Sequence, residues 1–259
     1  MYSYVDKKLY GPCQFLATQS ISEACRNMKQ SDHLYFKIYL IGSASTGLIT
    51  SSTGKSFDLD FNLVISSLPT EYANNLQRFK DLVRKRLDQV LTEHGFSNGQ
   101  DSTSAITYSH LNGSAPDFCL DICILKKEKD DAMSRLVHHK NDPDNFTRDT
   151  RKDFSDLNRR ENLIASSGKW EMLRDKYLKL KEKYASDPEH PSFVVYSEAV
   201  NLVWQQIPQE EIKMSKGKVS GNTHTQQQMN HHANQGNPNN AAHKAASDNH
   251  ANQMNPNHK

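Results

Sequence analysis

Short apolar runs bounded by turn-forming residues predict four strands in the first half of the chain. Residues 34–41 and 57–65 are the clearest, because each is a compact apolar segment followed by Gly or Ser. Residues 102–110 alternate more loosely, and an Asn-Gly pair then leads into a further apolar run over 117–125. An Asn-Gly pair between two such runs is typical of a hairpin. We therefore expect this half of the chain to form a sheet.

Apolar residues at helical spacing predict four helices, over residues 16–30, 70–94, 169–184 and 192–207. In the first, Ser20 and Glu23 have the spacing of a capping box. In the second, Thr70 is a candidate N-cap because it follows Pro69 at the start of the pattern. Residues 132–150 show no such pattern, and we expect a loop-rich connection there.

The strand predicted over 57–65 carries two aspartates in an otherwise apolar segment. Because side chains alternate between faces along a strand, Asp58 and Asp60 are expected to point the same way. Two neighbouring carboxylates repel each other and are costly to desolvate unless a positive charge lies between them. A divalent metal that prefers oxygen ligands, such as magnesium, meets that need.

Three features follow one another in the sequence. An apolar residue precedes Gly-Ser in Ile41-Gly42-Ser43, a spacer follows, and Asp58-Leu59-Asp60-Phe61 places two aspartates between apolar residues. This arrangement resembles the DNA polymerase β-like nucleotidyltransferase superfamily, over roughly the first half of the chain. The superfamily has a third carboxylate on a later strand, and Asp121, within the apolar run 118–125, is our candidate for it. Asp117, at the mouth of the same strand, is the alternative.

The resemblance implies an α+β fold, in which a mixed sheet with flanking helices is followed by a C-terminal helical region. It also implies a nucleotide cleft between the two. Magnesium, with manganese as the alternative, would be held by Asp58, Asp60 and Asp121 and would neutralise charge as the α-phosphorus of a nucleoside triphosphate is attacked. Gly42 and Ser43 would hold the β- and γ-phosphates, since a glycine lets the backbone approach phosphate oxygens closely.

Four basic residues are candidates for further phosphate contacts. Lys55 precedes the first aspartate by three positions, and Arg174, Lys176 and Lys179 belong to the helix predicted over 169–184. A solvated loop lysine, for Lys55, and a charged outer helix face, for the other three, are the interpretations that we favour. Their assignment to phosphate therefore stays open.

The function implied by the resemblance is transfer of a nucleoside monophosphate from a triphosphate to a hydroxyl acceptor, with release of pyrophosphate. Synthesis of a nucleotide second messenger is one form of this reaction. The alternatives are transfer to a small molecule, a protein or an RNA end, and a non-catalytic role in nucleotide binding or protein interaction. The motif leaves the acceptor open, because acceptor choice depends on the shape of the cleft.

Length and charge limit the remaining classes. The chain has 259 residues with 32 basic and 30 acidic side chains, which excludes a protein that coats nucleic acid through overall positive charge. It has no apolar signal segment and no apolar run long enough to span a membrane. The four cysteines do not form a secreted disulfide framework. We therefore expect a cytoplasmic protein without a membrane partner.

Composition divides the chain into three parts. Residues 1–130 are expected to form the nucleotidyltransferase catalytic domain, and residues 131–213 a helical C-terminal region. Residues 214–259 contain no aromatic side chain and are dominated by Asn, Gln and His. Such a segment buries too little apolar surface to fold, so we expect a disordered tail. Docking of a protein partner is our hypothesis for the role of this tail.

Overall fold

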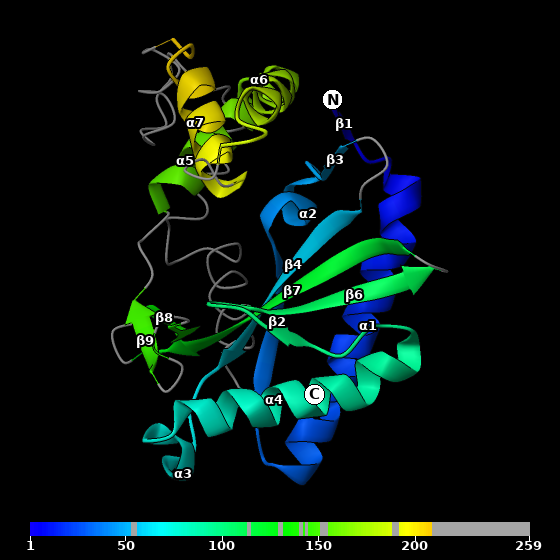
Figure 1. The fold of residues 1–259 in the computed structure, drawn as a ribbon. Helices are drawn as coiled ribbons and strands as arrows, with labels where there is room; N and C mark the ends of the chain where they lie inside the picture. The colour runs from blue at the N-terminus through cyan, green and yellow to red at the C-terminus, as the bar shows by residue number, and fades with distance from the viewer. Residues whose placement is uncertain are drawn as a thin grey trace, which may run out of the picture.

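The computed structural model describes residues 1–52, 56–112, 115–128, 132–139, 142, 145–150, 155–187 and 192–208. Its centre is a mixed sheet of seven strands (Figure 1). The order along the sheet is β2 (Phe36–Ile41), β4 (Phe57–Ile65), β7 (Ala115–Lys127), β6 (Ile106–Asn112) and β5 (Gln100–Asp101). Strands β4 and β7 are parallel, whereas β2 and β6 run antiparallel to these neighbours.

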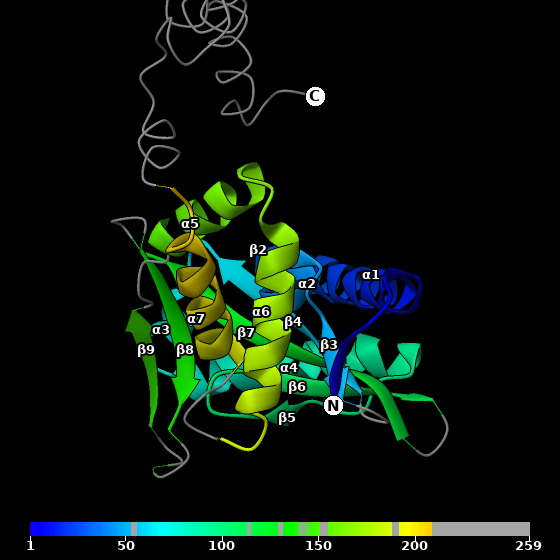
Figure 2. The ribbon, with the colours of Figure 1, turned by 90° about the horizontal axis from the view of Figure 1, so that it is seen from above.

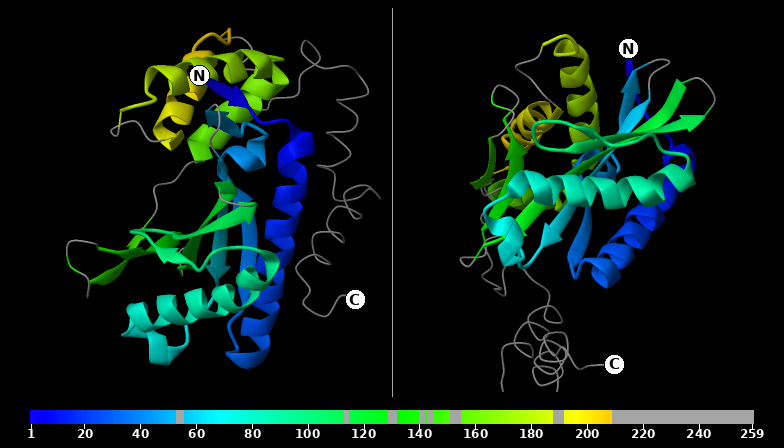
Figure 3. Two further views of the ribbon diagram at one scale, coloured as in Figure 1. Left: turned by 45° about the vertical axis from the view of Figure 1, so that its right-hand side comes forward. Right: turned by 60° about the horizontal axis from the view of Figure 1, so that its bottom comes forward.

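One face of the sheet forms the main core of the molecule. The alternate β4 residues Leu59, Phe61 and Leu63 are at most 1% exposed. They pack with buried residues of α1 (Lys7–Ser31) and α4 (Leu76–Leu91) in a single apolar cluster. Figure 3 shows α1 as a long helix running beside the sheet. The intervening β4 residues, Asp58, Asp60, Asn62 and Val64, therefore lie on the opposite face.

The C-terminal helices form a second core, which we call the helical lobe. It consists of α5 (Ser155–Ser166), α6 (Trp170–Lys183) and α7 (Ser192–Trp204). Leu48 is fully buried among their apolar side chains, although it belongs to the first half of the chain. It follows the short helix α2 (Gly42–Thr46), so the segment after Gly-Ser joins the sheet to the lobe (Figure 1).

A small separate sheet lies next to the helical lobe. Strand β1 (Tyr2–Tyr4) pairs antiparallel with β3 (Thr50–Ser52), which follows α2. Together with the mixed sheet and its flanking helices, this arrangement confirms the predicted α+β class. Helices α6 and α7 correspond closely to the patterns over 169–184 and 192–207. Every helix in the described residues is too short or too polar to span a bilayer.

The first helix begins earlier than predicted. The Asp6 side chain accepts a hydrogen bond from the Lys8 amide at 2.8 Å and starts α1 at Lys7, nine residues before the expected position. Ser20 lies inside this helix, where its hydroxyl donates to the Leu16 carbonyl. The capping box assigned to Ser20 and Glu23 is therefore wrong.

The helix predicted over 70–94 is interrupted. It forms α3 (Thr70–Ala73), α4 and the 3₁₀ turn η1 (Thr92–His94). Asn75 separates the first two, because its side chain accepts a hydrogen bond from the Arg78 amide at 2.9 Å and caps a new helix. The expectation that Thr70 caps one continuous helix is wrong.

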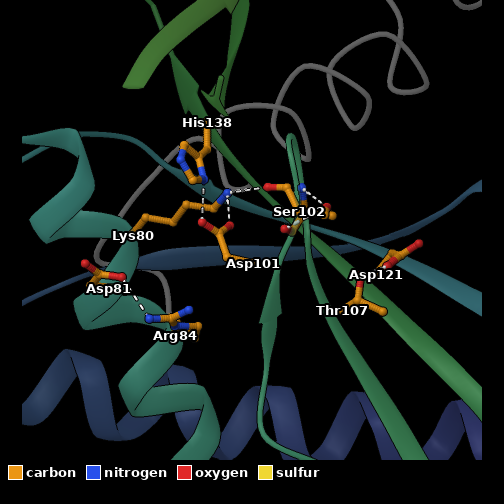
Figure 4. Close-up of polar contacts among 9 residues, drawn as sticks. Lys80, Asp81, Arg84, Asp101, Ser102, Thr107, Asp121 and His138 are labelled. Carbon is orange, nitrogen blue, oxygen red and sulfur yellow. Dashed lines mark hydrogen bonds and ion pairs between the residues drawn. The ribbon is translucent and has the colours of Figure 1, made fainter. Parts of the chain in front are cut away.

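The loop expected over 132–150 contains a hairpin. Strands β8 (Met133–His138) and β9 (Phe146–Thr150) pair with each other, and β8 also pairs with the end of β7. A buried charged network anchors the hairpin. Lys80, 3% exposed, forms an ion pair with Asp101, whose other oxygen lies 2.8 Å from His138 Nδ1 (Figure 4). The proposed boundary between residues 130 and 131 remains a prediction, and the tail at 214–259 lies outside the described residues.

Candidate active site

The strand register places the three predicted aspartates together. Strands β4 and β7 are paired in parallel with Asp60 opposite Asp121 and Asp58 opposite Cys119. Residues directly opposite each other share a face, and residues two apart along a strand do so as well. Asp58, Asp60 and Asp121 therefore occupy one patch on the face away from the main core.

The patch concentrates negative charge in a partly buried setting. Burial raises the pKa of Asp60 to about 6, and the charges of Asp121 and Asp58 add to the shift. Burial also raises the pKa of Asp58, as does Asp121, while Lys181 opposes the rise. Asp121 Oδ1 accepts a hydrogen bond from Thr107 Oγ1 at 2.5 Å (Figure 4). Asp58 and Asp60 are thus less stable as anions than exposed carboxylates, and a bound cation would relieve this cost.

Gly42 lies against this patch at the start of α2. Its φ of +66° is in the left-handed region that favours glycine. A Cβ at this position would collide with Asp60 Oδ2. The backbone at Gly42 therefore passes closer to a carboxylate than any other residue type allows, and Ser43 follows directly. The two halves of the sequence motif, separated by the spacer, are in contact here.

The donor set fits a hard divalent cation. Carboxylate oxygens are the ligands that magnesium prefers, and they stand next to each other on neighbouring strands. In the described part of the chain, no group of three or more His, Cys, Asp or Glu side chains forms a ready-made metal site. The case for a metal at Asp58, Asp60 and Asp121 thus rests on donor chemistry and on the raised pKa values of Asp58 and Asp60.

The helical lobe contributes a cation that the sequence did not single out. The charge of Lys181 on α6 lowers the pKa of Asp58, and burial lowers the pKa of Lys181 itself. Lys181 Nζ donates to Ser192 Oγ on α7 at 2.7 Å. One sequence feature could have pointed to Lys181. It lies four residues after Tyr177, which places it at the edge of the apolar stripe of α6.

The basic residues that the sequence offered as phosphate contacts are placed less favourably than Lys181. The Arg174 guanidinium stacks 4.2 Å from the Tyr4 ring centre and forms an ion pair with Glu171 at 3.4 Å. Lys176 is half-buried and Lys179 is exposed, and neither contributes to the pKa shifts of Asp58 or Asp60. Lys55 lies outside the described residues. Lys181 is therefore the better-placed cation of α6.

Asp117 is engaged elsewhere. Its Oδ1 lies 2.9 Å from His110 Nδ1 and accepts a hydrogen bond from the Phe118 amide at 2.9 Å. It precedes Asp121 by four residues along β7, so it is displaced from Asp60 along the strand. The structure thus brings Asp121, and not Asp117, beside the first two aspartates.

A buried amide continues the same row on β4. Asn62 shares the face of Asp58 and Asp60, is 8% exposed, and its Oδ1 has no hydrogen-bond partner among the described residues. Sequence reasoning missed it, although its alternation with the aspartates was visible. An unpaired buried acceptor costs about 1–3 kcal/mol, so Asn62 is a stability cost at this face.

We expect Asn62→Leu to raise the free energy of unfolding by about 1 kcal/mol, because it removes a buried acceptor and keeps the branched shape of the side chain. Urea denaturation of the metal-free protein at pH 7.5 measures the change. Asn62→Ala is the matched control and should lower stability, because it leaves a cavity. A loss of more than about 2 kcal/mol in Asn62→Leu would mean that the amide is hydrogen-bonded in solution.

Comparisons with known proteins identify the fold. No protein-family model and no curated sequence matches the chain. The structure matches DncV of Vibrio cholerae, a cyclic AMP-GMP synthase, in its complex with the linear intermediate 5′ pppA(3′,5′)pG. The TM-score is 0.50 at 12% identity, over 68% of this chain and 46% of that one. The chain has a nucleotidyltransferase fold.

This likeness confirms the predicted nucleotidyltransferase fold. The 3′-deoxy GTP-bound form of DncV gives a TM-score of 0.49 at 11% identity, covering 71% of this chain and 48% of that chain. The chain spans about half the length of the DncV chain that it matches. At such low identity the likeness concerns the fold, and the activity must be argued from the residues of this chain.

Proposed function

We propose that this protein transfers a nucleoside monophosphate from a nucleoside triphosphate to a hydroxyl acceptor and releases pyrophosphate. One observation carries the proposal. Three aspartates on two paired strands share a face at the point where a glycine backbone approaches Asp60 too closely for a Cβ. A nucleotidyltransferase fold around that patch supports the same reaction.

The three carboxylates share one role in this proposed reaction, and Asp121 has a second. Asp58, Asp60 and Asp121 would hold magnesium, which when bound supplies charge neutralisation at the phosphates. Thr107 occupies Oδ1 of Asp121 and fixes the orientation of the carboxylate. Oδ2 of Asp121 is the atom that we assign to take the proton of the acceptor hydroxyl as it attacks the α-phosphorus. Positioning and electrostatics then supply most of the catalysis.

The phosphate end of the substrate would lie between α2 and the helical lobe. The exposed backbone of Gly42 and the Ser43 hydroxyl face the β- and γ-phosphates in this proposal. Lys181, which already acts electrostatically on Asp58, supplies a positive charge from the other side. Ser192 holds that ammonium group by a hydrogen bond. Pyrophosphate thus leaves toward groups that stabilise its charge.

The acceptor in this proposal is a second nucleotide, so that the product is a linear or cyclic oligonucleotide. The support is the likeness to DncV, whose complexes include a linear dinucleotide intermediate. Incubation of the purified protein with magnesium and each α-labelled triphosphate, singly and in pairs, tests this. Labelled oligonucleotide with one pyrophosphate released for each linkage formed supports the proposal. Transfer only after addition of cell extract would instead identify a different acceptor.

Metal and pH are expected to act together on stability through Asp60. Its folded-state pKa of about 6 lies above the ordinary value of 3.8, so the unfolded chain binds fewer protons at pH 4–6. Stability therefore falls as pH rises through this range, and the loss is complete above about pH 6. At pH 7.5 without metal, Asp60→Asn should be more stable than wild type by about 1–3 kcal/mol.

Magnesium should close that gap by stabilising the wild-type protein and leaving Asp60→Asn nearly unchanged. Chemical denaturation at pH 5 and 7.5, with and without millimolar magnesium, measures the effect without any turnover. Equal stabilisation of both proteins by magnesium would contradict a metal site at Asp60.

A further inference from the structure

The first four residues of the chain lie along α6 of the helical lobe and contact it through Tyr2 and Tyr4. The Tyr4 hydroxyl donates to the Arg174 carbonyl at 2.7 Å, and the Arg174 guanidinium lies over the Tyr4 ring. Two turns further along α6, the Tyr2 amide donates to Glu182 Oε2 at 2.7 Å. Lys181 Nζ lies 5.1 Å from the centre of the Tyr2 ring. Figure 2 shows the N-terminus beside α6.

The same segment also pairs with β3, the strand that follows α2. Tyr2 pairs with Ser52 and Tyr4 with Thr50 in the antiparallel β1–β3 ladder. The Val5 amide extends the ladder by donating to the Ile49 carbonyl at 3.0 Å. Strand β1 thus lies between α6 and the segment that follows α2. We call residues 1–5 the N-terminal strap.

Lys181 of α6 is one of the residues that this strap contacts. Its ammonium group is flanked by the Tyr2 ring and the Ser192 hydroxyl, and its charge acts on Asp58. A free lysine side chain loses about 1.5–2 kcal/mol of conformational entropy when it is fixed. The Tyr2 ring and Ser192 already restrict this side chain in the free protein. Less conformational entropy is therefore lost when a ligand binds the ammonium.

We propose that Tyr2 is a positioning residue for the nucleotide. The Tyr2 ring, together with the Ser192 hydroxyl, holds the Lys181 ammonium in place for the triphosphate, so the N-terminal strap is part of the proposed binding site. This inference rests on the proposed function, because it takes a triphosphate as the partner of Lys181. Tyr2 acts through Lys181 and does not touch the reacting atoms.

A double-mutant cycle between Tyr2 and Lys181 tests the proposal. A cation–π contact contributes about 0.5–1 kcal/mol at exposed sites and about 2 when desolvated. Tyr2→Leu should therefore weaken the Kd of a non-hydrolysable triphosphate, and raise KM, by about three- to ten-fold with kcat within two-fold. Tyr2→Phe keeps the ring and should behave as wild type. In a Lys181→Met background, Tyr2→Leu should have almost no further effect.

The matched control is Tyr4→Leu, which removes a similar contact of the strap to Arg174. Its effect on Kd should be the same in both backgrounds, since the guanidinium of Arg174 is engaged with the Tyr4 ring and Glu171. The proposal is overturned if Tyr2→Leu weakens Kd by the same factor in the wild-type and Lys181→Met backgrounds. It is likewise overturned if Lys181→Met alone leaves Kd unchanged. Absence of turnover with an intact cycle in Kd would overturn the proposed transfer reaction and leave the role of Tyr2 standing.

Discussion

Replacing Asp60 with Asn is expected to lower nucleotidyl transfer by about a thousand-fold, the scale seen when one group that stabilises developing charge is lost. The exchange keeps the size of the side chain and removes the charge that would hold the metal. Asp60 lies opposite Asp121 on the paired strand, and burial raises its pKa to about 6. Initial rates of pyrophosphate release, at saturating triphosphate and magnesium, measure the loss.

Asp117→Asn is the matched control for Asp60→Asn. Asp117 is an aspartate of the same face of β7, but its carboxylate is occupied by His110 and the Phe118 amide. We expect the turnover of the Asp117→Asn variant to remain within about three-fold of wild type, because the Asp117 side chain is not among the proposed metal ligands. A loss in Asp117→Asn as large as in Asp60→Asn would show that the third carboxylate has been misassigned.

Gly42→Ala is expected to lower turnover by about a hundred-fold, as a misplacement near 1 Å does in other catalytic sites. The new methyl group collides with Asp60 Oδ2, so either the carboxylate or the backbone of α2 must shift. Forcing a residue with a Cβ into the left-handed region also costs about 1–2 kcal/mol of stability. Rate measurements and chemical denaturation on the same preparation separate the two effects.

Gly47→Ala separates backbone strain from the collision. Gly47 ends the same short helix with φ of +70°, but the nearest atom to a Cβ there is Tyr10 Oη at 3.8 Å. This variant should lose stability to a similar extent and keep turnover within about three-fold of wild type. If both glycine variants lose activity equally, the close approach to Asp60 has no catalytic importance.

The strands and the face of the site were predictable because they follow from a period of two. Alternation alone placed Asp58 and Asp60 on one side of a buried strand, and the apolar setting of Asp121 suggested a neighbouring strand. The strand register shows that the three share a patch. Their roles came from the resemblance, since no physical rule in the sequence distinguishes a metal ligand from a tolerated carboxylate.

The parts that escaped prediction depend on contacts between distant residues. Strands β8 and β9 lack a clear alternation, and they are held by pairing with β7 and by the bond between His138 and Asp101. In the sequence, Lys181 is one of several charged residues of α6. Only the fold shows that its charge acts on Asp58. Leu48 shows the same limit, because it completes the core of helices that begin over a hundred residues later.

A crystal structure of the protein with manganese and a non-hydrolysable triphosphate tests the central claim most directly. Manganese substitutes for magnesium at oxygen sites and is visible by its anomalous scattering. Our account predicts anomalous peaks between Asp58, Asp60 and Asp121, with the triphosphate against Gly42 and Ser43. Manganese bound away from these carboxylates, or a triphosphate that does not contact Gly42, would contradict it.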